Sequence, residues 1–128
     1  MQLCLAPLQE IAPAGFELPA NACDTHAHVV SDDTNAYPFV ANRSYTPPGA
    51  PESKYLSMLE RTGMQRGVLI QISVYGDDNR YMLDVLKRHP DTLRGIAVVR
   101  EDVTHAQLQQ MHEEDEMASI SAPTAWRV

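Results

Sequence analysis

Strand-like and helix-like segments alternate along this chain, a pattern that few folds accommodate. Short apolar runs, typical of buried parallel strands, are separated by longer segments in which apolar residues recur every three or four positions. Such alternation predicts parallel strands joined by right-handed crossovers, an α/β fold. We expect strands at Ala22–Val30, Gly67–Ser73 and Gly95–Val99, and helices at Pro51–Thr62, from Asp77 or Asp78 to about His89, and from Thr104 onward.

Residues at the predicted helix ends support this assignment. Pro51 suits the first turn of its helix, and Gly63 suits the left-handed position that ends it. Pro90 stops the second helix. Thr104 and Gln107 have the spacing of a capping box at the start of the third helix.

Composition limits the partners of the chain. Its 128 residues suffice for one domain, and a formal charge of −7 without a basic stripe argues against nucleic acid or an anionic membrane as partner. The first twenty residues lack the positive region of a signal peptide, so we expect a cytoplasmic protein. We divide the chain into an N-terminal arm (1–20), one domain (21–113) and an irregular tail (114–128), in which a fourth strand is due and none is recognisable.

Asp24, His26 and His28 alternate along the first predicted strand. Successive side chains on a strand point to opposite faces, so these three are expected to share one face. The two imidazoles are close enough to bind one cation, although a catalytic zinc usually takes three protein ligands. Asp24 could then accept a hydrogen bond from an imidazole and fix its tautomer, as a second-shell residue. The alternative is a pair of polar residues that only bind nearby loops.

The segment Cys23–Val29 resembles the first-strand signature of the amidohydrolase superfamily. The similarity extends over residues 20–112 and is greatest to the amidohydrolase-related group (amidohydrolase 2), in the branch around 2-pyrone-4,6-dicarboxylate lactonase. The other matching motifs are Tyr45–Pro47, Gly67–Gln71, Asp78–Arg80 and Arg94–Val99.

This resemblance implies a (β/α)₈ TIM barrel, of which the chain holds about three βα units. It implies a metal-dependent hydrolase of lactones, esters or amides, with a small carboxylate as substrate, such as a carboxylated lactone. His26 and His28 match divalent-metal ligands, for zinc or manganese, although in the lactonase branch the pair can act without a tightly held metal. Tyr45, Gln71 and Ser73 match positions that face the substrate.

The resemblance also implies that the chain is incomplete. A typical barrel needs about 250 residues, and the family's remaining metal-site residues lie on later strands. We therefore expect a truncated barrel that is inactive alone, through a truncated gene, a shifted reading frame or a mis-called gene end. One alternative is a non-catalytic fragment that persists by associating with another chain or with a second copy as a homo-oligomer. Another is an unrelated α/β module with a structural metal.

Overall fold

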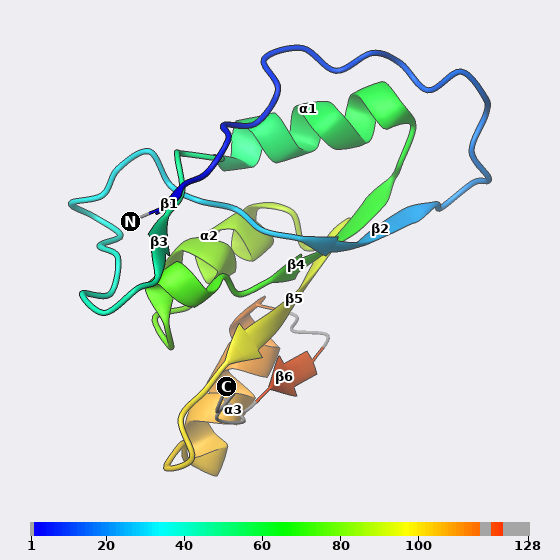
Figure 1. Cartoon of the computed structure of the whole chain (residues 1–128). Helices are drawn as coiled ribbons and strands as arrows, with labels where there is room; N and C mark the ends of the chain where they lie inside the picture. The colour runs from blue at the N-terminus through cyan, green and yellow to red at the C-terminus, as the bar shows by residue number, and fades with distance from the viewer. Residues whose placement is uncertain (1, 116–118, 122–128) are drawn as a thin grey trace.

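A parallel β-sheet with helical crossovers forms the body of the chain (Figure 1). The computed structural model describes residues 2–115 and 119–121. The main sheet has the order β2-β4-β5-β6, and every neighbouring pair is parallel. Its strands are β2 (Cys23–Ala27), β4 (Arg66–Ile70), β5 (Leu93–Val98) and β6 (Ser119–Ser121), and the helices between them are α1 (Glu52–Thr62), α2 (Arg80–Arg88) and α3 (His105–Asp115).

The predicted α/β order is confirmed, with differences at the ends of elements. The strands are shorter than expected at their carboxyl ends, since β2 ends at Ala27 and β4 at Ile70. A short 3₁₀ helix, η1 (Ser73–Tyr75), follows β4. Gly63 ends α1 with φ of 81°, as predicted, and the Thr104–Gln107 capping box forms in both directions.

β6 corrects one expectation. No fourth strand was recognisable after residue 113, yet Ser119–Ser121 pairs in parallel with Ile96–Val98 of β5. Three residues are too few to show the alternation by which a strand is recognised in a sequence. This strand is defined by its pairing with β5.

The two faces of the sheet differ in burial. On one face, Leu69, Leu93 and Ala97 are completely buried and belong to the same core as the helix residues Val85 and Leu86. On the other face the side chains are only half-buried, and most are apolar. These are Val68, Ile70, Arg94, Ile96 and Val98. The helices therefore cover one face of the sheet, as they cover the outside of a barrel.

The N-terminal segment runs past α1 before it enters β2 (Figure 1). Its first residues form β1 (Gln2–Leu3), which pairs in parallel with β3 (Tyr45–Thr46) in the long loop after β2. Two side chains of α1 hold it: Lys54 donates to the side-chain oxygen of Gln9 at 3.0 Å, and Arg61 to the carbonyl of Ile11 at 2.9 Å. Among the described residues, no helix is long and apolar enough to cross a membrane.

Candidate functional site

The candidate site lies at the carboxyl ends of β2 and β4. His26 belongs to β2 and His28 follows it, while Ser73 lies just beyond β4. Carboxyl ends of parallel strands meet at the same edge of a sheet, and in (β/α)₈ enzymes that edge carries the active site. Tyr45 joins this group from the loop that follows β2.

The two histidine rings lie side by side. Their centroids are 5.2 Å apart with an angle of 86° between the ring planes, and both side chains are exposed. Nδ1 of His28 lies 2.8 Å from the carbonyl oxygen of Ile70. Because a carbonyl only accepts, Nδ1–H must be the donor, and the neutral ring then has its lone pair on Nε2. The strand end of β4 therefore orients the ring of His28 and leaves its Nε2 as the acceptor.

A β-bulge in β2 contradicts the prediction that Asp24, His26 and His28 lie on one face of the strand. In the register with β4, Asp24 lies opposite Gly67 and Ala27 lies opposite Leu69, so three steps on β2 match two on β4. Gly67 and Leu69 share the helix-covered face, and Asp24 and Ala27 therefore share it too. His26, which precedes Ala27 within the strand, projects from the opposite face, and His28 follows the end of β2 with its ring against the carbonyl of Ile70. The prediction that Asp24 shares a face with His26 is wrong.

The contacts of Asp24 agree with this orientation. Its Oδ2 accepts a hydrogen bond from the hydroxyl of Tyr55 on α1 at 3.2 Å, and its Oδ1 accepts one from the backbone N–H of His26 at 3.2 Å. The carboxylate thus supports the backbone of the histidine pair. The predicted hydrogen bond from an imidazole ring to Asp24 stays a prediction.

Tyr45 and Ser73, two of the predicted substrate contacts, are brought together. Their hydroxyl oxygens are 3.2 Å apart, and either can be the donor. The side chain of Ser73 is exposed and that of Tyr45 half-buried. Two adjacent hydroxyl groups at a strand end can donate hydrogen bonds to a carboxylate, which accepts up to four.

Gln71, the third predicted contact, is placed differently. Its side chain is buried, and its amide nitrogen donates to the carbonyls of Asp78 and Gly76 at 2.8 and 3.3 Å. These bonds use both N–H groups of the amide. Gln71 therefore holds the loop between η1 and α2 and is not brought to Tyr45 and Ser73.

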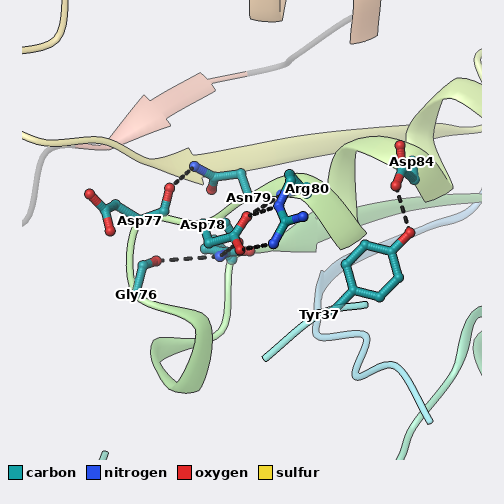
Figure 2. Close-up of polar contacts among 8 residues, drawn as sticks. Tyr37, Gly76, Asp77, Asp78, Asn79, Arg80 and Asp84 are labelled. Carbon is teal, nitrogen blue, oxygen red and sulfur yellow. Dashed lines mark hydrogen bonds and ion pairs between the residues drawn. The ribbon is translucent and has the colours of Figure 1, made fainter. Parts of the chain in front are cut away.

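Asn79 fastens the same loop to β5 and was not recognised as a structural residue in the sequence. Figure 2 shows its amide bonded to Asp77 within that loop. Asn79 is 4% exposed. Its amide nitrogen donates to the carbonyls of Asp77 and Val98, and its amide oxygen accepts from the backbone N–H of Val98. The neighbouring Arg80 forms an ion pair with Asp78, and the hydroxyl of Tyr37 donates to Asp84 on α2 at 2.7 Å.

The histidine pair fits part of a metal site. Two imidazoles on adjacent exposed positions, one with its Nε2 lone pair available, can supply two nitrogen ligands to a divalent cation. Within residues 2–115 and 119–121, no three His, Cys, Asp or Glu side chains are grouped so that they could hold a metal ion. The remaining ligands of a catalytic site would have to come from outside this part of the chain.

The other histidines have separate surroundings. Nε2 of His89 lies against Oε1 of Glu52, and the same carboxylate also binds Arg88. His105 is exposed at the start of α3. Neither lies on the strand that carries the candidate site.

The segment of the chain that carries this site is similar in sequence to known proteins. Residues 23–118 match the sequence model of the amidohydrolase family. A 4-sulfomuconolactone hydrolase of Hydrogenophaga intermedia is 36% identical over 108 residues, which are 84% of this chain and 35% of that protein. A 2-pyrone-4,6-dicarboxylate hydrolase of Comamonas testosteroni is 38% identical over 98 residues, which are 77% of this chain and 32% of that protein.

Solved structures show the same relationship. A probable 2-pyrone-4,6-dicarboxylic acid hydrolase of Acinetobacter baumannii, with citric acid bound, superposes with a TM-score of 0.71 at 32% identity, over 78% of this chain and 36% of that one. A protein of Agrobacterium tumefaciens shares the fold with a TM-score of 0.72 at 18% identity, over 85% and 39% of the two chains. The chain spans about a third of the length of the relatives it matches.

Proposed function

Because this chain belongs to the amidohydrolase family, we propose that it forms the histidine-bearing first part of a barrel that hydrolyses a small carboxylated lactone. The paired rings of His26 and His28 at the carboxyl end of the sheet carry this proposal. The relatives named as hydrolases of sulfonated and dicarboxylated ring compounds support the class of substrate. We further propose a cytoplasmic location, in keeping with a small dissolved substrate.

In lactone hydrolysis, water adds to the ring carbonyl carbon, the bond from that carbon to the ring oxygen breaks, and a hydroxy acid forms. We assign His26 and His28 to the carbonyl end of the substrate, as neutral nitrogen ligands of a divalent metal such as zinc or manganese. Such a metal supplies polarisation of the carbonyl and activation of water. Tyr45 and Ser73 would donate hydrogen bonds to a carboxylate of the substrate.

We expect a general base and further ligands on later strands of the barrel, because the chain spans about a third of its relatives' length, and we propose that this chain alone is inactive. The pair can also act without a tightly held metal. His28 donates through Nδ1 to Ile70, and its Nε2 remains available to accept a proton or a hydrogen bond.

A chimera tests the proposed role of the pair. Residues 23–112 of this chain would replace the matching segment of the Comamonas testosteroni hydrolase, and hydrolysis of 2-pyrone-4,6-dicarboxylate would be followed by loss of pyrone absorbance. We expect an active chimera that loses at least about 100-fold in kcat/KM with His28→Ala, a ΔΔG‡ of about 2.7 kcal/mol. His105→Ala, an exposed histidine on α3, is the control. A His28→Ala chimera as active as the control would contradict the proposal.

A second candidate function is non-catalytic association. The half-buried apolar side chains on the uncovered face of the sheet favour it, because such a face is normally covered in a folded domain. A second copy of this chain is one partner that could cover it. A monodisperse monomer with a cooperative thermal transition would contradict this candidate.

A further inference from the structure

We infer that Tyr55 is a positioning residue for the histidine pair, and that Gly67 leaves the space its hydroxyl needs. This inference rests on the proposed function only for the use of the pair, since the contacts themselves belong to the fold. Tyr55 lies on α1 and Gly67 on β4, and neither touches the imidazole rings in the contacts described. Their effect on the pair passes through Asp24.

The hydroxyl of Tyr55 occupies the space beside Gly67. A Cβ atom at Gly67 would lie 2.0 Å from that oxygen and 2.9 Å from Cζ of the ring. Real Cβ atoms do not approach so closely, so any larger residue at this position would displace the tyrosine. The φ of Gly67 is not in the left-handed region. Between β4 and α1, Gly67 is therefore needed because it leaves room for the tyrosine, and its backbone conformation does not require glycine.

The same hydroxyl holds Asp24 on the helix-covered face of the sheet. It donates to Oδ2 of Asp24 at 3.2 Å, and Tyr55 is only 7% exposed. Burial and the neighbouring carboxylate raise the pKa of Tyr55, so its hydroxyl keeps its proton and remains a donor. The carboxylate is thus fixed from the side of α1.

The β-bulge beside Asp24 decides where His26 points. From a residue that faces the helices, regular alternation would turn position 26 toward the helices as well. The bulge between Asp24 and Ala27 reverses this and turns His26 to the uncovered face, where its ring lies beside that of His28. A bulge leaves a backbone group without its ladder partner, and here Oδ1 of Asp24 accepts the hydrogen bond from the N–H of His26.

Tyr55→Phe in the full chain tests the inference. The measurements are the NOE between the ring protons of His26 and His28 and the affinity for Zn²⁺ by titration calorimetry. We expect Tyr55→Phe to weaken the NOE and lower the Zn²⁺ affinity by about fivefold or more. The matched control is Tyr81→Phe. Tyr81 is 8% exposed, and its hydroxyl accepts a hydrogen bond from the backbone N–H of Glu52.

The readouts separate positioning from a general loss of stability. Tyr55→Phe and Tyr81→Phe should lower the thermal midpoint by similar amounts, whereas only Tyr55→Phe should alter the ring contact. Gly67→Ala should reproduce Tyr55→Phe, and if it does not fold, Tyr55→Phe decides alone. A Tyr55→Phe variant with the wild-type NOE would overturn the inference. If wild-type protein binds no Zn²⁺ while the NOE is lost in Tyr55→Phe, the metal part of the proposed function fails and the positioning role stands.

Discussion

At the scale of single residues, the side chain of Asn79 makes three hydrogen bonds from a buried position. Its buried amide bonds both the N–H and the carbonyl of Val98 and so joins the start of α2 to the end of β5. Asn79→Ala leaves those backbone groups without their partner, and an unsatisfied buried group costs about 1–3 kcal/mol. We expect the free energy of unfolding to fall by about 2 kcal/mol in urea titrations. Asn42→Ala, at an exposed loop position, should change it by less than about 0.5 kcal/mol.

The sequence indicated which side chains lie near the strand ends. It did not indicate which hydrogen-bond partners each of them has. His26 and His28 lie side by side, and the hydroxyl of Tyr45 lies beside that of Ser73, a contact that the sequence did not predict. Gln71 has the same polarity but bonds the loop beneath, because the carbonyls of Gly76 and Asp78 turn toward it. Such a turn depends on loop geometry that no pattern in the sequence records.

At the scale of elements, Glu52 joins the first turn of α1 to the end of α2. Its carboxylate binds Arg88 and His89, and the hydrogen bond from Arg88 holds the pKa of Glu52 below its usual value of 4.5 against the opposing effect of burial. Because the pKa of Glu52 is lower in the folded state than its usual value, the pairing of its carboxylate stabilises the fold above pH 4.5. This stabilisation is lost as the pH falls through the pKa of Glu52 in the folded state.

Replacing Glu52 by Gln removes this titration. We expect Glu52→Gln to be less stable than wild type near pH 6, and the difference between the two free energies of unfolding to shrink as the pH is lowered toward 3. Urea titrations across this range give the measurement. Glu60→Gln, at an exposed position of the same helix, is the control and should show a smaller change in that difference. A difference between wild type and Glu52→Gln that does not vary with pH would count against the pairing.

Helices with end signals and strands with apolar runs were predictable, and features that depend only on strand pairing were not. Gly63 and the Thr104–Gln107 box mark helix ends through local chemistry, which acts within a few residues. The bulge in β2 and the strand β6 depend on the register with a neighbouring strand. Register is a long-range property, and strict alternation was therefore the wrong rule for Asp24.

At the scale of the whole molecule, the uncovered face of the sheet is the feature with the largest consequence. Ile70 and Ile96 are half-buried there beside Val68 and Val98, while the opposite face is closed by helices. Covering such a side chain completely contributes up to about 1.5–3 kcal/mol, and the part already buried in this chain reduces that gain. Burying these residues would stabilise the association with any polypeptide that covers this face, either further strands of a barrel or a second copy of the chain.

Ile96→Ser therefore separates association through this face from association elsewhere. If copies of the chain associate, we expect the substitution to weaken dimerisation by about tenfold, equivalent to about 1.4 kcal/mol, in sedimentation equilibrium. Leu8→Ser is the control, because Leu8 is 73% exposed on the N-terminal arm and does not belong to a strand of the main sheet. Equal weakening by both substitutions would locate the contact outside the uncovered face. If Ile96→Ser alone weakens it, the same surface that would line a complete barrel is the one through which this chain associates.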